Sequence, residues 1–293
     1  MNALAHTLAV HQQQGFEVYV LRNEQIELAV VPDLGAKIIS LKNLRTGRQW
    51  MWHPPTGARL FANLPGDDFS KSPLVGADEC LPTIAPCVWQ GRELPDHGEV
   101  WSAPWRVDAE AWANGIVKTS VRLKISPFEF ERTIELHEHE LRLKYRLRNS
   151  SAQAEAFLWA FHPLLNLQPE DQLVLPGSTR ALLNGASWVD TVPLNIPEKS
   201  STKVFAQRVT EGFTRIHNRN TGDRLEFAWN PVENDTLGLW FTRGGWHGFH
   251  QFALEPTNGG SDALTLAAEQ SHCGMVPPSD SISWQICLRV ESN

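Results

Sequence analysis

The sequence has few cysteines and no cluster of positive charge. It contains 4 Cys in 293 residues, and no two of them form a Cys-x-x-Cys pair, so the pattern predicts neither a zinc knuckle nor a dithiol redox motif. All four are expected to be reduced structural thiols: Cys80, Cys87, Cys273 and Cys287. The net charge is −7 without a basic stripe, which argues against nucleic acid and against an anionic membrane surface as partners.

Long hydrophobic runs are also missing. The apolar stretches are far shorter than the roughly 20 residues that span a bilayer. Residues 1–18 lack a basic start followed by an apolar stretch, so we expect no signal peptide and a cytoplasmic location. The sequence has no P-loop, no Gly-x-Ser-x-Gly and no Gly-x-Gly-x-x-Gly after a strand, so it offers no motif for a nucleotide or a serine nucleophile.

Alternation of apolar and polar residues dominates the chain. Residues 128–136 and 141–147 alternate on either side of a short polar segment, which predicts an antiparallel hairpin with one buried face. Residues 281–290 predict a long final strand. Further strands are expected in three shorter runs, at 224–229, 236–242 and 250–255. Helical turns are expected only near 67–72 and 261–269, and residues 62–82 and 256–263 are expected to be long functional loops. The fold class predicted is therefore all-β, a large antiparallel sandwich, with residues 1–293 as one domain.

Tryptophan is unusually abundant, with 12 Trp against 2 Tyr. An indole ring fills a core well, and it also stacks on the apolar face of a sugar ring. The stretch LPDHGEVWSAPW (94–105) places Trp101 beside three ionisable residues, which is unusual for either a core strand or a solvated loop.

Three residues are candidates for acid–base chemistry. His97 precedes a glycine, and His162 precedes Pro163, which is expected to end a strand and leave the histidine at a sheet rim. Glu255 ends an apolar run, so partial burial would strengthen it as a base. Histidine is suited to proton transfer because its ordinary pKa of about 6.5 lies near cellular pH.

The remaining clusters are weaker. The HEH of residues 137–139 lacks the spacing of a zinc site and is expected to be a solvated turn. His247 and His250 are candidates for lining a pocket. Four acidic residues could hold sugar hydroxyls or a cation, namely Asp67, Asp68, Asp78 and Glu79.

Three segments together resemble the aldose 1-epimerase (galactose mutarotase) superfamily. LPDHGEVW resembles the segment around the family's first active-site histidine, HPLLNL resembles the segment of its second, and LEPTNGGSDAL resembles the segment of its catalytic glutamate. They occur in the family's order, and residues 31–52 and 130–151 are similar to its opening strands and central hairpin.

The resemblance implies a β-supersandwich that interconverts the α and β anomers of an aldose, as a monomer or homodimer without cofactor or metal. It implies that His162 is the general acid, Glu255 the general base, and His97 a hydrogen-bonding partner of the sugar. We further expect Asp78, Glu79, Trp101 and His247 to contact the sugar.

Departures from the family leave the substrate open. In hexose-6-phosphate mutarotases an arginine follows the His-Gly motif, whereas this chain has Glu99 and its neighbours there. A carboxylate at that place would repel a phosphate, so a neutral aldose is favoured. A modified or phosphorylated sugar is an alternative. A non-catalytic carbohydrate-binding protein of the same fold is another, and it predicts that His97, His162 and Glu255 do not converge.

Overall fold

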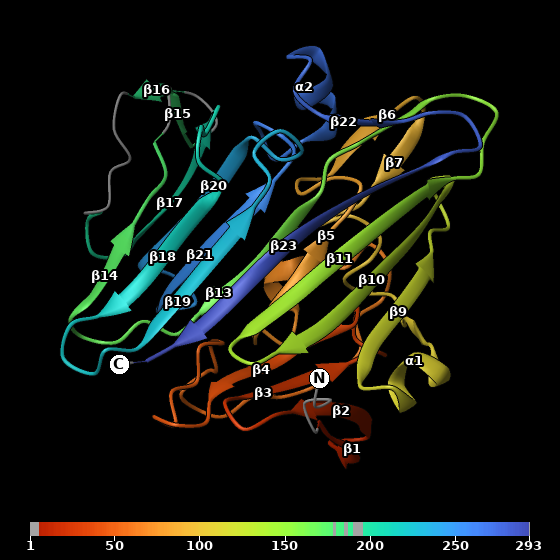
Figure 1. The fold of residues 1–293 in the computed structure, drawn as a ribbon. Coiled ribbons are helices and arrows are strands. Elements are labelled where there is room, and N and C mark those ends of the chain that lie inside the picture. The colour runs from red at the N-terminus through yellow and green to blue at the C-terminus, as the bar shows by residue number, and fades with distance from the viewer. Residues whose placement is uncertain (1–5, 178–179, 185–186, 190–195, 293) are drawn as a thin grey trace.

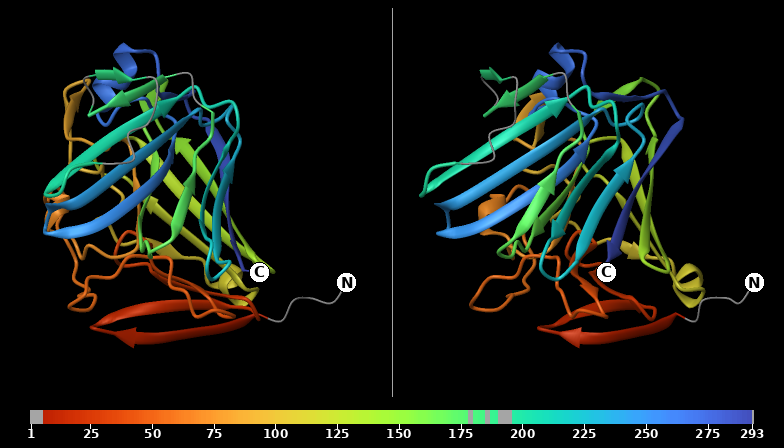
Figure 2. Two further views of the ribbon diagram at one scale, coloured as in Figure 1. Left: turned by 90° about the vertical axis from the view of Figure 1, so that its left-hand side faces the viewer. Right: turned by 60° about the vertical axis from the view of Figure 1, so that its left-hand side comes forward.

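The computed structural model describes residues 6–177, 180–184, 187–189 and 196–292. Two antiparallel sheets face one another as the layers of a sandwich (Figure 2). The hairpin of β1 and β2 and the short helix α2 lie at opposite ends of the molecule (Figure 1). The predicted all-β sandwich is therefore confirmed.

The larger sheet has eleven strands in the described part of the chain. In spatial order they are β1 (Thr7–Gln13), β2 (Phe16–Arg22), β3 (Ile26–Val31), β4 (Lys37–Asn43), β5 (Ala77–Cys80), β13 (Ala160–Leu165), β21 (Phe249–Thr257), β20 (Thr236–Trp246), β17 (Ser200–Gln207), β15 (Arg180–Leu183) and β16 (Ser187–Val189).

The second sheet has eight described strands. They are β14 (Asp171–Val174), β18 (Phe213–Asn218), β19 (Arg224–Trp229), β23 (Ser281–Glu291), β11 (Glu140–Asn149), β10 (Phe128–His137), β9 (Ile116–Arg122) and β8 (Arg106–Val107).

Short elements complete the fold. Two strand pairs stand apart from the large sheets, and the helical segments are brief. They are β12 (Glu155–Phe157) with β22 (Gly274–Val276), β6 (Cys87–Trp89) with β7 (Arg92–Leu94), the 3-10 turn η1 (Phe69–Lys71), α1 (Ala109–Ala113) and α2 (Leu264–Glu269). In the ranges that the structure describes, no helix is long and apolar enough to cross a membrane.

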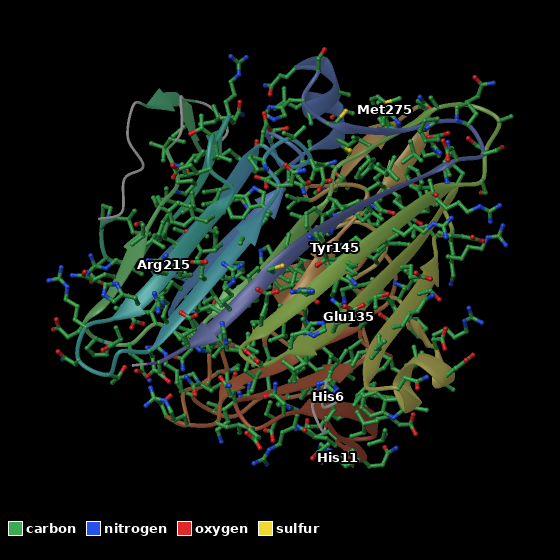
Figure 3. All side chains as sticks on the ribbon, in the orientation of Figure 1. His6, His11, Glu135, Tyr145, Arg215 and Met275 are labelled. Carbon is green, nitrogen blue, oxygen red and sulfur yellow. The ribbon has the colours of Figure 1, made fainter. Side chains whose placement is uncertain are left out.

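The alternation predicted from the sequence is seen in the strands. The 128–147 hairpin forms as β10 and β11, with Phe130 opposite Leu147 and both side chains buried. Figure 3 labels one residue of each orientation on this hairpin: Tyr145 is buried, whereas Glu135 lies on the outer face and binds Lys144. Each fully buried large apolar side chain of such a face contributes about 1.5–3 kcal/mol relative to exposure.

Two expectations need correction. Residues 62–82 are not one loop, because 77–80 form β5 in the middle of the large sheet. Helix α1 at 109–113 was not predicted, since its five residues are too few to show a helical period; Asp108 caps it by accepting hydrogen bonds from two backbone amides. The expected turns near 67–72 and 261–269 appear as η1 and α2.

A buried carboxylate connects the two sheets. Glu79 of β5 is 0% exposed and accepts hydrogen bonds from Arg132 Nη1 at 3.0 Å, Tyr145 OH at 3.0 Å and Trp159 Nε1 at 2.8 Å. Arg132 and Tyr145 belong to the second sheet, so one side chain of the large sheet is bound across the core. Arg132 also donates to the backbone oxygen of Ala36.

Removing Arg132 should leave this carboxylate uncompensated. Arg132→Met is expected to lower the free energy of unfolding by about 3–5 kcal/mol, the usual cost of breaking a buried ion pair from one side. Adding Glu79→Gln should recover part of the loss, because an amide needs no counter-charge. Urea denaturation of the wild type, both single variants and the double variant measures this, and a loss below about 1 kcal/mol for Arg132→Met would contradict it.

Candidate active site

Strand register places His162 and Glu255 side by side. β13 lies between β5 and β21, and the pairs Ala160–Thr257 and Leu164–Ala253 set Glu255 directly opposite His162. Directly opposed residues share one face of a sheet. His162 Nε2 is accordingly 3.6 Å from Glu255 Oε1, and both side chains are buried.

The proline after His162 does not end the strand, contrary to the sequence-based expectation. β13 runs from Ala160 to Leu165, and the backbone N–H of Leu164 donates to the oxygen of Gly76 at 2.9 Å. The ladder therefore resumes one residue after Pro163. As a result, His162 lies within the sheet at 6% exposure and not at its rim.

His97 reaches the same place from a turn. His97 and Gly98 both have positive φ, 56° and 74°, and a Cβ on Gly98 would lie 2.0 Å from the backbone oxygen of Leu81. Only glycine fits there, so residue 98 fixes the turn that presents His97. The His97 ring stacks on Phe69 with centroids 3.8 Å apart, and its centroid is 5.3 Å from that of His162.

Asp96 orients His97. Its Oδ1 is 2.8 Å from His97 Nδ1, and Oδ2 accepts the backbone N–H of Phe69. Burial opposes ionisation of Asp96, but the hydrogen bond and charge of His97 outweigh it and hold the pKa of Asp96 below its usual value. An ionised carboxylate only accepts hydrogen bonds, so Nδ1 carries a proton and Nε2 remains for a ligand.

Burial disfavours the charged form of both His162 and Glu255, but only for His162 does it decide the charge. Burial lowers the pKa of His162 to about 3, against a smaller opposing effect of the Glu255 charge, so His162 is neutral near pH 7. For Glu255, burial is the largest effect and disfavours the charged form, but the charge and hydrogen bond of Lys203, together with contributions from His162 and His97, outweigh it and hold the pKa below the ordinary value. Lys203 Nζ is 2.5 Å from Glu255 Oε2.

A cleft of about 400 Å³ opens over these residues, within the range of roughly 300–1,000 Å³ that is typical of ligand pockets. Polar and aromatic side chains converge on it. Polar groups for a ligand come from Asp68, Asp96, His97, His162, Ser201, Lys203 and Asp262. Aromatic surface comes from Phe69, Trp240 and Trp246. Glu255 lies beneath the cleft, enclosed at 0% exposure.

The four residues expected to contact a sugar are not part of this lining. Asp78 is enclosed and bound to Lys37, on the same face as His162 but under the cleft. Glu79, the next residue along the strand, faces the core. Trp101 is 2% exposed, packs edge-on behind Phe69 and donates its Nε1–H to Asp96 O at 2.8 Å. His247 is exposed and packs on Trp246, which does line the cleft.

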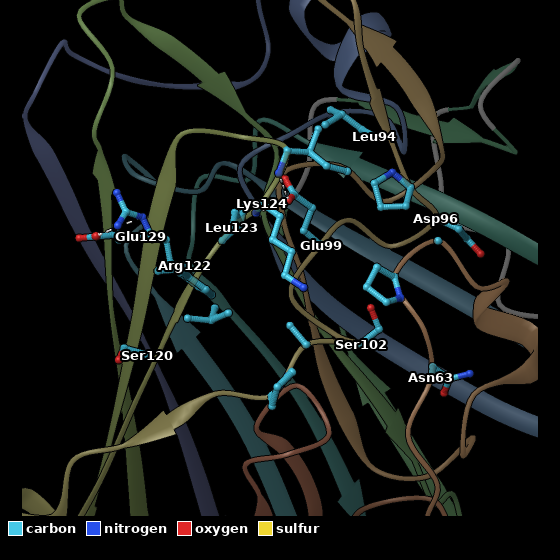
Figure 4. Close-up of a pocket in the computed structure, with 18 of the residues that line it drawn as sticks. Asn63, Leu94, Asp96, Glu99, Ser102, Ser120, Arg122, Leu123, Lys124 and Glu129 are labelled. Carbon is cyan, nitrogen blue, oxygen red and sulfur yellow. Dashed lines mark hydrogen bonds and ion pairs between the residues drawn. The ribbon is translucent and has the colours of Figure 1, made fainter.

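Glu99 does not face the cleft either. Its carboxylate accepts hydrogen bonds from the backbone N–H groups of Lys124, Ile125 and Ser126 at 2.7–2.9 Å. It lines a larger neighbouring groove of about 1720 Å³, which shares Asp68, Pro86 and Asp96 with the cleft, and Figure 4 shows it there beside Lys124. The argument against a phosphate therefore cannot depend on Glu99. Negative charge at the cleft comes instead from Asp68, Asp96 and Asp262.

Sequence reasoning missed several residues of the cleft. Asp96 had a visible signal, since it precedes His97, and Asp262 lies in the segment that carries Glu255. Trp240 and Trp246 had only the general excess of tryptophan as a signal. Lys203 had none, because a single lysine in a strand is usually solvated. Among the described residues, no cluster of His, Cys, Asp and Glu could hold a metal ion, and all four cysteines are free.

Comparison with known proteins identifies the family of this chain. The family profile described as Aldose 1-epimerase matches residues 17–227, a range that includes both histidines and ends before Glu255. This chain belongs to the aldose 1-epimerase family. A comparison with curated proteins found no match.

Solved structures share the fold at low identity. The Slr1438 protein of Synechocystis sp. PCC 6803 is 18% identical with a TM-score of 0.76, covering 94% of this chain and 96% of that one. A putative aldose 1-epimerase of Escherichia coli K12 is 14% identical with a TM-score of 0.71, covering 99% and 100%. A galactose mutarotase-like protein of Clostridium acetobutylicum is 13% identical with a TM-score of 0.73, covering 98% and 99%.

The buried imidazole of His162 should make stability sensitive to acid. The folded-state pKa of His162, about 3, lies below its ordinary value of 6.5. The contribution of the neutral imidazole to the free energy of unfolding is therefore complete above pH 6.5 and is lost as the pH falls toward 3. The loss for one proton approaches about 1.4 kcal/mol per pH unit. Urea denaturation at several pH values should show a flatter acid dependence for His162→Gln, whereas His11→Gln on the exposed strand β1 should follow the wild type. Parallel curves for wild type and His162→Gln would refute the assignment.

Proposed function

We propose that this protein is a mutarotase, an isomerase that interconverts the α and β anomers of a neutral aldose. The observation that carries the proposal is the convergence of His97, His162 and Glu255, from a turn and two adjacent strands, around one cleft. A carbohydrate-binding protein without catalysis would not need a carboxylate and two imidazoles at this spacing.

The reaction needs one proton removed and one delivered. Glu255 Oε1 takes the proton of the anomeric hydroxyl, whose O–H electron pair forms the C1=O bond while the C1–O5 bond breaks. A histidine gives a proton to O5. Rotation about C1–C2 and re-closure by the reverse steps yield the other anomer, so no atom is gained or lost.

We assign the proton donor to His97 and not to His162, which the family resemblance had suggested. Burial keeps His162 neutral, with a pKa of about 3. His97 lines the cleft, and the Asp96 carboxylate, 2.8 Å from its Nδ1, orients the ring for proton transfer through Nε2. His162 then serves as a neutral hydrogen-bonding group beside Glu255.

The cleft favours a neutral sugar. Three carboxylates, those of Asp68, Asp96 and Asp262, line it, whereas Lys203 and the proton donor His97 are already paired with Glu255 and Asp96. Like charges would repel a phosphate or a uronate. Trp240 and Trp246 pack edge-to-face at the cleft and offer apolar surfaces to the C–H groups of a pyranose.

Polarimetry tests the activity directly. Freshly dissolved α-glucose and α-galactose, within a panel of neutral aldoses, should relax faster with the protein than in buffer. Glu255→Gln should lose about 10²–10⁴-fold of the acceleration, which is the usual share of general acid–base catalysis. The control is Glu135→Gln on the outer sheet face. Binding of a sugar without any acceleration would instead support a carbohydrate-binding protein. If no sugar binds, both the mutarotase and the carbohydrate-binding hypothesis are contradicted.

The role of Asp96 separates the two histidines. Asp96→Asn should lower kcat by roughly tenfold or more with a small change in KM, because the ring of His97 loses the carboxylate that orients it and fixes its tautomer. Asp67→Asn, the same charge change on a carboxylate bound to Asn63 and Leu64, is the control. If Asp96→Asn keeps full kcat while His162→Gln abolishes it, the proton donor is His162.

A further inference from the structure

Lys203 is the charged group closest to Glu255 in the described chain. Its Nζ is 2.5 Å from Glu255 Oε2 and 3.7 Å from Asp262 Oδ1. The lysine side chain is only 15% exposed and the glutamate side chain is 0% exposed, so this ion pair is largely shielded from water. Such a pair must be positioned by the fold, because desolvating both charges is costly.

A glycine on the intervening strand makes the contact possible. β20 lies between β17, which carries Lys203, and β21, which carries Glu255. Gly238 of β20 is the cross-strand partner of Glu255, and a Cβ there would lie 3.2 Å from Glu255 Cβ and 3.3 Å from Oε2. Without a side chain at 238, the lysine can cross over β20 to the carboxylate.

The two oxygens of Glu255 have different surroundings. Oε2 is bound by Lys203, whereas Oε1 has no hydrogen-bond partner among the described residues and has His162 Nε2 at 3.6 Å. The lysine thus holds one oxygen of the carboxylate and leaves the other enclosed but without a hydrogen-bond partner among the described residues. A base needs such a free oxygen at a defined position.

Other charged or titratable groups also lie near Glu255. His162 of β13 is neutral because of its burial. Cys80 of β5 has its thiol pKa raised, first by burial and then by the charge of Glu255. His97, from the 95–98 turn, also lowers the pKa of Glu255, but less than Lys203 does, and Asp262 adds negative charge 3.7 Å from Lys203 Nζ. Lys37, the other buried ammonium nearby, is bound to Asp78.

We propose that Lys203 is a positioning residue for Glu255: it keeps the enclosed carboxylate ionised, holds Oε2 and leaves Oε1 to accept the proton of the anomeric hydroxyl. This inference deepens the proposed mutarotase function and rests on it. The same contact sets a compromise, since the lysine makes the base available near neutral pH but also weaker.

Lys203→Met tests the proposal through the pH profile. Without the ammonium, the largest effect that opposes burial is lost and the pKa of Glu255 rises, so the acid limb of the kcat profile should move to higher pH. Acceleration over buffer should be largely lost below neutral pH and should recover as the pH rises. Lys203→Arg should keep the wild-type limb, and Lys144→Met, on the outer sheet face, is the matched control for loss of a lysine.

Three outcomes for Lys203→Met would overturn the proposal. A higher KM with an unchanged pH profile would make Lys203 a sugar ligand. A higher kcat in Lys203→Met would mean that the lysine blocks the base. A lower melting temperature with unaltered kinetics per folded molecule would make its role purely structural, which also contradicts the proposal.

Infrared titration keeps the test independent of catalysis. The difference spectrum between wild type and Glu255→Gln isolates the carboxyl group of Glu255. The proposal requires no protonated band near neutral pH in the wild type and such a band in Lys203→Met. If the wild type shows no mutarotation, this titration still measures the effect of Lys203 on the protonation of Glu255. If Lys203→Met does not fold, a protonated band of Glu255 in the wild type near neutral pH would by itself overturn the proposal.

Discussion

The hydrogen bonds to the enclosed carboxylate of Glu79 connect the two sheets, and the candidate site depends on them. Glu79 stands on β5, and its partners Arg132 and Tyr145 stand on β10 and β11. Binding across the core fixes β5 against the second sheet. Because β5 pairs directly with β13, it also fixes the strand that carries His162. Burial raises the pKa of Glu79 to about 6 in spite of Arg132, which shows how far this carboxylate is removed from water.

The alternation of a β-strand then separates structure from function within two consecutive residues. Glu79 points to the core, and its neighbour Asp78 points to the face that carries His162 and Glu255. The site is therefore built mainly on rigid strands, with register deciding which groups meet. Only His97 comes from a turn, and that turn is fixed by the close approach of Gly98 to Leu81. A functional site on a scaffold of this kind is held more precisely than one made from loops alone.

The sequence predicted this fold well because its strands are amphipathic. The 128–147 hairpin and the strand at 281–290 show the period of two that one buried face requires, and both form in the structure. The three central site residues could be found for a different reason: each lies in a segment similar to a family motif. Asp78, Glu79 and Trp101 show the limit of such reasoning. All three lie near His162 or His97, but Asp78 binds Lys37, Glu79 binds Arg132 and Trp101 packs against Phe69. Only the three-dimensional packing decides these directions.

The ion pairs near the site show why Lys203 could not be predicted. Three carboxylates of the large sheet are enclosed, and each has its own cation from another strand: Lys37 for Asp78, Arg132 for Glu79 and Lys203 for Glu255. An isolated buried carboxylate would become protonated, so a cation is required wherever the charge must persist. The sequence shows the carboxylates but not which cation reaches them, because each pair is 41 or more residues apart.

For Asp78 and Glu255, one oxygen binds the cation and the other has no hydrogen-bond partner among the described residues. For Glu79, Tyr145 and Trp159 supply the remaining hydrogen bonds. The carboxylate of Glu79, with all its hydrogen bonds made, thus stabilises the core. Of the other two, Glu255 is the one whose unpartnered oxygen lies 3.6 Å from His162 Nε2, where it can act as a base.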